Sequence, residues 1–313
     1  MNRYNNPFPF SDDNKRYHTW NYYLKHKFGN KTAKVPLDAG FSCPNRDGTK
    51  GFGGCTYCSA KGSGDSILAR GNLMEQYEQG LSVMQRKWPD CQGIAYFQAF
   101  TNTYGPMEKL KQCFSPFIQR EDVCAIAIAT RADCLEDEKI AYLCKLAKEK
   151  EVWVELGLQS IHDHTAALIN RGHDFSEFRS CVERLASTPL HVCVHLINSL
   201  PMETKSQMIE SARIVGSLPI EAVKIHMLHL VKGTQLAKQY EKNPFPLLTM
   251  EEYVDVVISQ LELLPPEIII QRLTGDGILS DLLAPFWTTH KVQVLNEIDK
   301  AMAKRNTWQG KYK

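Results

Sequence analysis

Three cysteines stand close together in the stretch CPNRDGTKGFGGCTYC, where Cys43, Cys55 and Cys58 follow the spacing C-x11-C-x2-C. Thiolates are ligands of zinc and of iron–sulfur clusters. A structural zinc site takes four ligands, usually from two C-x2-C pairs or from one pair and two histidines, and this stretch has one such pair. A [4Fe-4S] cluster takes one thiolate for each iron, so three thiolates leave one iron open to bind another molecule. The spacing therefore favours an iron–sulfur cluster with an open iron over a zinc site.

The residues between these cysteines suit a loop that encloses a bulky group. Glycines at positions 48, 51, 53 and 54 allow the backbone to fold closely around an inorganic core and to point N–H groups at its sulfurs. Tyr57, between Cys55 and Cys58, is placed to cover the cluster or to touch a ligand of the open iron. The other seven cysteines are scattered through apolar or helix-like segments, and we expect them to be ordinary buried side chains.

The composition is that of a folded chain with a substantial core. It has 313 residues, 43% apolar content and a formal net charge of +2. The longest apolar runs fall well short of the ~20 residues that cross a bilayer, and the polar, aromatic start does not resemble a signal peptide. We therefore expect a cytoplasmic protein with no membrane partner, in which cysteines are reduced or metal-bound.

Short apolar runs alternate with amphipathic segments along most of the chain. Near-continuous apolar strands separated by helices are typical of a parallel sheet with crossover helices. The number of units is too large for a small doubly wound domain and too small for a closed eight-unit barrel. The pattern predicts an α/β fold, an open partial (β/α)6 TIM-like barrel of about six strands. The strand candidates are 35–41, 93–100, 123–131, 152–160, 190–200, 222–230 and 267–275, and the helix candidates are 72–87, 107–119, 136–149, 176–187, 204–216 and 249–262.

Two extensions flank the predicted barrel. Residues 1–30 form a basic and aromatic N-terminal extension, residues 31–275 the barrel, and residues 276–313 a C-terminal helical extension. Parallel βα folds bind ligands at the carboxyl ends of their strands. Because the cysteine loop follows the first strand candidate, we expect it on that active face.

A three-cysteine loop that follows the first strand of a partial barrel and ends in C-x-aromatic-C resembles the radical S-adenosylmethionine (SAM) superfamily. Most of that superfamily has a first gap of three residues. The gap of eleven here resembles the branch that includes elongator-type tRNA-modifying enzymes and bacterial YhcC/YtqA-type proteins. VELGLQS (154–160), NRGHDFSEF (170–178) and HLINSLPMET (195–204) also resemble segments of this branch, with Ser199 where its pattern has Gly.

The resemblance implies two cofactors, a [4Fe-4S] cluster on the three cysteines and SAM. In related enzymes a Gln after strand four, an Arg twelve residues later and an acidic residue in strand five contact SAM. The corresponding positions here are Gln159, Arg171 and His195, the last a departure from the acidic residue. Further cofactor-binding candidates are Tyr57, Glu155 and the groups at the end of the second strand, Gln98, Thr101 and Asn102.

The resemblance also implies the reaction. A reduced cluster cleaves SAM to methionine and a 5′-deoxyadenosyl radical, with the electron supplied by a donor such as flavodoxin or ferredoxin. The implied substrate is tRNA, at the carbon-5 side chain of the wobble uridine. One concrete hypothesis is conversion of a carboxymethylaminomethyl group to aminomethyl, with release of glyoxylate.

Basic residues near the N-terminus supply candidate RNA contacts. They are interleaved with Tyr, His and Trp, which combines phosphate-binding charge with stacking surfaces. The segment WNYYLKHKF is also typical of an amphipathic helix that packs its aromatic side chains on the barrel. The candidates are Lys15, Arg16, Lys25, Lys27, Lys31 and Lys34.

Two other functions are compatible with the residues. The modest net charge of +2 allows radical chemistry on a small molecule or a peptide in place of tRNA. A non-enzymatic zinc-binding RNA module would use the cysteine loop as a structural staple. The barrel pattern disfavours the second alternative, because a staple does not require a barrel.

Overall fold

The structure is a computed structural model that describes residues 6–62, 64, 67, 71–275, 277 and 279–313. Residue 276, where the C-terminal extension was expected to start, and the first five residues lie outside the described residues.

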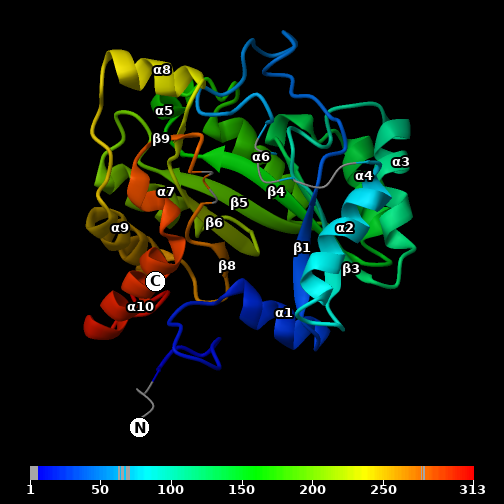
Figure 1. Ribbon diagram of the computed structural model, residues 1–313, viewed down its shortest axis with the longest axis horizontal. Helices are drawn as coiled ribbons and strands as arrows, with labels where there is room; N and C mark the ends of the chain where they lie inside the picture. Colours follow the sequence, from blue (N-terminus) through cyan, green and yellow to red (C-terminus); the bar gives the residue numbers. More distant parts are fainter. Residues whose placement is uncertain (1–5, 63, 65–66, 68–70, 276, 278) are drawn as a thin grey trace.

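Seven parallel strands form one curved sheet, in which each strand lies beside its neighbours in the chain (Figure 1). The predicted partial barrel is confirmed, with seven strands in place of about six. The difference arises at the edge, where the last candidate contributes a short strand that pairs with its predecessor through Ala222 and Ile269. The strands are β1 (Thr32–Leu37), β2 (Gln92–Phe97), β3 (Val123–Thr130), β4 (Glu151–Gln159), β5 (His191–Asn198), β6 (Ala222–Met227) and β8 (Ile269–Arg272).

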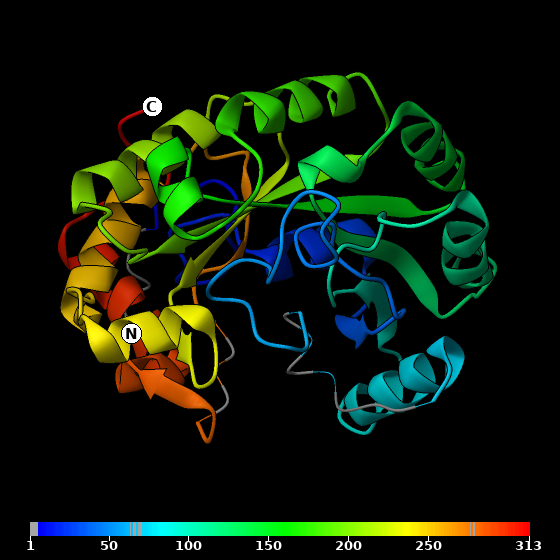
Figure 2. The same ribbon diagram turned by 90° about the horizontal axis from the view of Figure 1, so that it is seen from above.

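Helices cover the convex side of the sheet, as Figure 2 shows from above. The six predicted helices are present as α2 (Leu73–Gln85), α3 (Met107–Ile118), α4 (Asp137–Leu146), α6 (Phe175–Leu185), α7 (Lys205–Val215) and α9 (Met250–Leu263). Several begin with strong sequence signals. Thr249 and Glu252 form a capping box at the start of α9, in which the side chain of each accepts a hydrogen bond from the backbone N–H of the other. Thr204 and Gln207 form the same capping box at the start of α7. Short α5 (Asp163–Leu168) follows β4.

Alternation along the strands separates two apolar layers. Ile126 and Ile128 of β3 pack in the main core with the outer helices, whereas Ala125 and Ala127 face the concave side. Small residues on the inner face leave room there for another element. Helix α1 (Trp20–Phe28) occupies it.

Helix α1 lies inside the curve of the sheet, toward the amino ends of the strands (Figure 2). Leu24 is 6% exposed and packs with Ile94 and Trp153. The ring of Trp20 meets that of Trp153 edge to face, with 4.9 Å between the centroids. This part of the N-terminal extension is therefore packed into the barrel, in agreement with the amphipathic-helix interpretation of WNYYLKHKF.

The C-terminal segments pack beside the last strands and tie the two ends of the chain together. The Gln309 side chain accepts a hydrogen bond from the backbone N–H of His18 at 2.8 Å and donates to the carbonyl of Ile268 at 2.8 Å. Within the described residues, no helix has the length and apolar character needed to cross a bilayer. The remaining elements are β7 (Leu230–Val231), which pairs with β9 (Leu282–Ala284), and the helices α8 (Gln235–Lys242) and α10 (Lys291–Lys304).

Candidate active site

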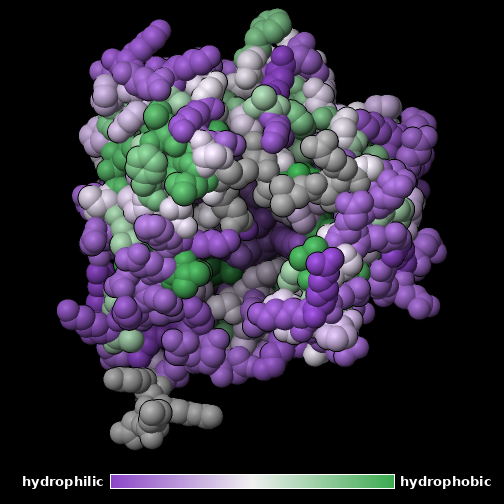
Figure 3. Space-filling view, in the orientation of Figure 1, coloured by the Kyte–Doolittle hydropathy of each residue, from purple (hydrophilic) through white to green (hydrophobic). Residues whose placement is uncertain are grey.

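A cavity of about 930 Å³ occupies the concave side of the barrel, above α1. It opens on the face seen in Figure 3, where hydrophilic side chains surround the hollow. Cys43, Cys55 and Cys58 line one part of it, and inward-facing side chains of β1 to β8 line the rest. The cysteine loop thus lies on the active face, as its position after the first strand predicted.

Hydrogen bonds to the rest of the barrel hold the cysteine loop. The backbone N–H of Thr56 donates to the carbonyl of Ile169 at 2.9 Å, and the Asn170 side-chain amide donates to the carbonyl of Gly54 at 2.8 Å. Within the loop, the N–H of Cys58 donates to the carbonyl of Cys55 at 2.9 Å and closes a turn between the two cysteines. Gly54 has a φ of 77°, a left-handed conformation that favours glycine.

The environment of Cys55 suits a ligand that takes up thiolate charge. Burial raises the pKa of its thiol to about 11, and the neighbouring Cys58 and Cys43 add to this, while the Arg131 guanidinium opposes it. The Asn45 side-chain amide lies 3.9 Å from the Cys55 sulfur. The three cysteines line the same cavity, and an electropositive ligand bound there would favour the thiolate of Cys55.

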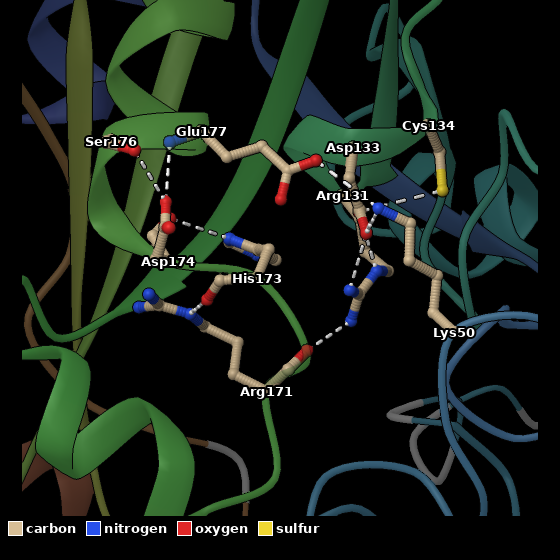
Figure 4. A network of polar contacts seen from close by, with 9 residues as sticks. All are labelled: Lys50, Arg131, Asp133, Cys134, Arg171, His173, Asp174, Ser176 and Glu177. Carbon is tan, nitrogen blue, oxygen red and sulfur yellow. Dashed lines mark hydrogen bonds and ion pairs between the residues drawn. The ribbon is translucent and has the colours of Figure 1, made fainter.

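A buried polar network fixes the segment that follows β4 (Figure 4). Arg131 donates to both oxygens of Asp133 at 2.8 Å and to the backbone carbonyl of Arg171 at 2.6 Å. Arg171 is 1% exposed and donates to the carbonyls of His173 at 3.0 Å and Ser160 at 2.5 Å. Within the described part of the chain its Nη2 is buried without a hydrogen-bond partner, and it lies 3.7 Å from an Asp163 oxygen. Burial lowers the pKa of Arg171 from its ordinary value.

Four non-glycine residues in the motifs of the sequence have a left-handed backbone: Gln159, Asn170, Ser199 and Met202. Gln159, which ends β4 and lines the cavity, has a φ of 69°. Such strain in a residue other than glycine is concentrated at functional sites. Ser199 has a φ of 75°, which explains why the related pattern has Gly at this position.

A charged cluster lies deeper in the cavity, around Glu155 of β4. Lys34 of β1 and Lys224 of β6 form ion pairs with its carboxylate, and His195 Nε2 lies 3.0 Å from Glu155 Oε2. Burial raises the pKa of Glu155, but the two ammonium groups and His195 outweigh it and hold the pKa well below its usual range. Burial and the nearby Lys224 ammonium lower the pKa of His195 to about 4, so its imidazole is neutral at neutral pH.

Most of the expected cofactor residues meet in this one cavity. Its lining includes Tyr57, Gln98, Thr101, Glu155, Gln159, Arg171 and His195. Asn102 lies outside the lining and is fully buried. Its side-chain amide donates to the carbonyls of Phe97, Ala99 and Ala129, each at 3.0 Å, so it joins the end of β2 to β3 and is a structural group.

The six basic residues expected to bind RNA do not form one free surface. Lys15 pairs with Asp299, Lys25 with Asp12 and Lys27 with Glu151. Arg16 is 7% exposed and donates to Asn306, and Lys31 donates to Asn21 and lies over the ring of Trp88. Lys34 lies inside the cavity on Glu155. Each member of the set has a partner within the chain.

Sequence reasoning missed several cavity residues. Lys224 and His226 of β6 line the cavity, and both are polar residues at alternate positions of the apolar run AVKIHM. That period of two places them on one face of a strand, the concave one. A lysine within such an apolar run was the signal in the sequence that could have identified these cavity residues. Tyr96, Arg131 and Arg272 also line the cavity.

Together, a partial barrel of seven parallel strands and a three-thiol loop over its cavity define the architecture of a radical SAM enzyme. The chain belongs to the radical SAM superfamily: residues 45–215 match the profile of the radical SAM superfamily, and residues 220–304 match that of the radical SAM C-terminal domain.

Full-length relatives share this organisation. The Bacillus subtilis protein YtqA is 48% identical over 309 residues, which cover 98% of this chain and 96% of YtqA. The Escherichia coli protein YhcC is 33% identical over 278 residues, which cover 88% of this chain and 89% of YhcC. A tRNA uridine(34) acetyltransferase of Methanocaldococcus infernus is more weakly similar: it is 26% identical over 155 residues, which cover 49% of this chain and 28% of that protein.

The solved structure of archaeal Elp3 from Methanocaldococcus infernus, with an N-terminal deletion, has a similar fold. It superposes with a TM-score of 0.64 at 17% sequence identity and covers 90% of this chain and 64% of that chain. This likeness supports the partial barrel fold.

Proposed function

We propose that this radical SAM enzyme uses a [4Fe-4S] cluster and SAM to modify the carbon-5 side chain of the wobble uridine of tRNA. The superfamily implies both cofactors. Three observations support the proposal: the residues fit the cofactors, the cavity attracts anions, and a relative acts on tRNA uridine 34.

The residues around the cavity fit the cofactors. Cys43, Cys55 and Cys58 would hold the cluster through three irons, because they line one cavity from one anchored loop. Arg171 and Gln159 face the same space, and the buried Nη2 of Arg171 has no hydrogen-bond partner in the described part of the chain. An acceptor atom of SAM would satisfy it. When bound, the reduced cluster and SAM supply a 5′-deoxyadenosyl radical together with methionine.

The chain's own residues would bind and shield the reaction. The polar ends of the strands, Gln98, Thr101 and Gln159, orient SAM, and Tyr57 covers the cluster from between two of its ligands. Helix α1 closes the cavity below and limits the access of water and stray hydrogen donors from that side.

The substrate assignment rests on charge and on kinship. Among the described residues that line the cavity, the acidic ones are Glu155 and Asp281, whereas the basic ones are Lys31, Lys34, Arg46, Arg131, Arg171, Lys224 and Arg272. Such a surplus of cations attracts anionic substrates. A related protein, matched over about half of this chain, is a tRNA uridine(34) acetyltransferase. These two facts favour a tRNA wobble uridine over a neutral small molecule.

The concrete reaction that we propose is conversion of a carboxymethylaminomethyl uridine to aminomethyl uridine. The glycyl carbon first loses a hydrogen atom, which becomes part of 5′-deoxyadenosine. The same group then loses one electron and one proton. Water adds to the resulting imine, the C–N bond breaks, and glyoxylate leaves. A one-electron carrier of the flavodoxin or ferredoxin class delivers the electron for SAM cleavage and accepts the one from the substrate.

The observation that carries this proposal is the cysteine loop over a cation-rich cavity. Anaerobic reconstitution of the cluster in the purified protein tests it. The protein is loaded with iron and sulfide, then given SAM, reductant and tRNA from cells that lack it. We expect about four irons per chain, loss of one uridine derivative and matching amounts of 5′-deoxyadenosine and glyoxylate. Cys55→Ala should abolish all of these. Cys144→Ala is the matched control, because Cys144 lies on α4 outside the cavity lining.

Two outcomes would contradict the proposal. SAM cleavage that does not depend on tRNA, with no nucleoside consumed, would indicate a small-molecule or peptide substrate. One zinc and no iron in the reconstituted protein would indicate a structural metal site.

A further inference from the structure

Four side chains from four strands meet deep in the cavity, and we call them the floor cluster: Lys34, Glu155, His195 and Lys224. Glu155 is 1% exposed, and both of its oxygens are in use. Lys34 Nζ contacts Oε1, whereas Lys224 Nζ and His195 Nε2 contact Oε2. All four residues line the same cavity as the three cysteines.

The floor cluster carries more positive than negative charge. Its one carboxylate faces two ammonium groups, and the His195 imidazole is neutral at neutral pH because burial lowers its pKa to about 4. Arg272 of β8 lines the cavity as well. An excess charge in a buried site is costly unless a partner completes it. The Tyr96 ring lies 4.9 Å from Lys34 Nζ and 4.6 Å from Lys224 Nζ, and its hydroxyl accepts from Lys224 at 3.2 Å. These partners are neutral, so an anion would balance the remaining positive charge.

Two half-buried side chains beside the cluster have buried nitrogen atoms. In the part of the chain that the structure describes, Gln271 Nε2 and His226 Nε2 are buried without a hydrogen-bond partner. Gln271 accepts from Lys34 at 2.6 Å through its oxygen, and the His226 ring lies 5.3 Å from that of His195. Both line the cavity. A ligand with acceptor oxygens would satisfy the Gln271 amide and His226 in its N–H tautomer.

A metal ion fits this place poorly. Glu155, Cys193 and His195 offer ligand atoms within 4.8 Å of one another. However, the ammonium groups of Lys34 and Lys224 already occupy the Glu155 oxygens and would repel a cation.

Two members of the floor cluster, Glu155 and His195, were also expected to contact SAM, but the cluster lies below the other expected contacts at the carboxyl end of β4. Glu155 precedes Gln159 by four residues on β4, which places it about 13 Å deeper along the strand. A group that reaches the floor from the cysteine loop must therefore belong to an extended ligand. A carboxylate at the end of a flexible side chain suits this depth better than the bulkier phosphates of an RNA backbone.

We propose that the floor cluster binds a carboxylate of the substrate between the Lys34 and Lys224 ammonium groups. Glu155 then serves as a positioning residue that holds the two lysines apart and oriented. The identity of the substrate, a wobble uridine whose side chain ends in a carboxylate, rests on the proposed function. The anion site itself rests only on the cluster geometry.

Binding of two RNA stem-loops tests the proposal on the reconstituted protein. One anticodon stem-loop carries carboxymethylaminomethyl uridine, and the other carries aminomethyl uridine, which lacks the carboxylate. We expect the wild-type protein to bind the first about tenfold more tightly, because two charge-assisted contacts to the carboxylate outweigh the cost of desolvating it. Lys224→Met and Lys34→Met should each bring this ratio close to one.

Two further variants separate charge from folding. Lys139→Met removes a buried lysine that pairs with Glu136 at 2.7 Å outside the cavity, and it should keep the wild-type ratio. Glu155→Gln keeps the shape of the side chain and one acceptor oxygen for the lysines but removes the competing charge, so it should raise the ratio severalfold. Damage to the fold cannot produce such a gain.

An independent titration distinguishes failure of the anion site from failure of the proposed function. Acetate, inorganic phosphate and Zn²⁺ are added separately, and tryptophan fluorescence is followed, because the Trp20 ring lies 5.0 Å from Lys34 Nζ. Saturable acetate binding that Lys224→Met removes supports the site even if no tRNA is modified. Three results would overturn the proposed carboxylate site. They are a preference for phosphate or Zn²⁺ over acetate, equal binding of both stem-loops by the wild-type protein, and a ratio of stem-loop affinities that Lys224→Met leaves unchanged.

Discussion

Arg171 links the backbone of the barrel to the cofactor space. Its Nε and Nη1 donate to the carbonyls of His173 and Ser160. The remaining Nη2 is buried and has no hydrogen-bond partner among the described residues. A planar fork of donors can make all of these contacts at once, whereas an ammonium cannot.

Arg171→Lys should therefore destabilise the protein by about 2–4 kcal/mol, because buried carbonyls lose their donors. It should also weaken SAM binding at least severalfold. Urea unfolding of the purified protein and equilibrium dialysis with SAM measure the two effects. Arg179→Lys on the exposed side of α6 is the control and should stay within about 0.5 kcal/mol of wild type. A loss below 1 kcal/mol in Arg171→Lys would refute the anchoring role.

At the scale of single residues, sequence motifs identified the residues at and after the end of β4 but not the floor cluster. Gln159 and Arg171 stand at fixed distances after a recognisable strand, so the sequence could indicate them. The pairing of Lys34 with Lys224 depends on the curvature that brings β1 and β6 to face the same carboxylate, and no local pattern encodes it. His195 was expected to replace an acidic residue, and the structure places the Glu155 carboxylate beside it.

Helix α1 closes the amino end of the barrel. Small residues of β3, Ala125 and Ala127, leave space on the concave face, and Leu24 and Trp20 fill it. The amphipathic pattern of residues 20–28 predicted the helix, but not whether its apolar side packs inside the curve or on the outer surface. That choice depends on side-chain volumes in three strands far along the chain.

Leu24→Ala should cost about 2–4 kcal/mol of stability, because it leaves a cavity between α1 and the inner face of the sheet. Urea or thermal unfolding measures this loss. Val83→Ala on α2 is a suitable control, since Val83 is 60% exposed. If both variants were equally stable, α1 would be a surface arm and its aromatic side chains would be available for RNA.

At the scale of the whole molecule, segments far apart in sequence build one site. The cysteine loop follows β1, the residues expected to contact SAM lie at the end of β4 and in the segment after it, and the floor cluster draws on β1, β4, β5 and β6. The alternating pattern predicted this parallel order, because consecutive βα units lie side by side. The link between the two ends, through Gln309 and His18, could not be predicted, since a single glutamine gives no signal of its partner.

The charge of the whole cavity should make substrate binding sensitive to alkaline pH. Burial lowers the pKa of Lys224 to about 8, against the opposing attraction of Glu155. The neighbouring groups do not titrate between pH 7 and 9: Glu155 stays ionised, Tyr96 has a pKa raised well above its usual value by burial, and burial raises the pKa of Cys193 to about 12. As the pH rises through about 8, Lys224 loses its proton and the floor loses a positive charge.

Affinity for the carboxylate-bearing stem-loop should therefore fall as the pH rises from 7 to 9, while affinity for the stem-loop without the carboxylate changes little. Stability should move in the opposite direction. The folded-state pKa of Lys224 lies below its unfolded value of 10.5, so protonation disfavours the folded state, and stability rises as the pH increases from about 8 toward 10.5. Binding isotherms and urea unfolding at matched pH separate loss of the ligand charge contact from alkaline unfolding. In Lys224→Met both pH trends should disappear, and a wild-type-like decline in that variant would assign the titration to another group.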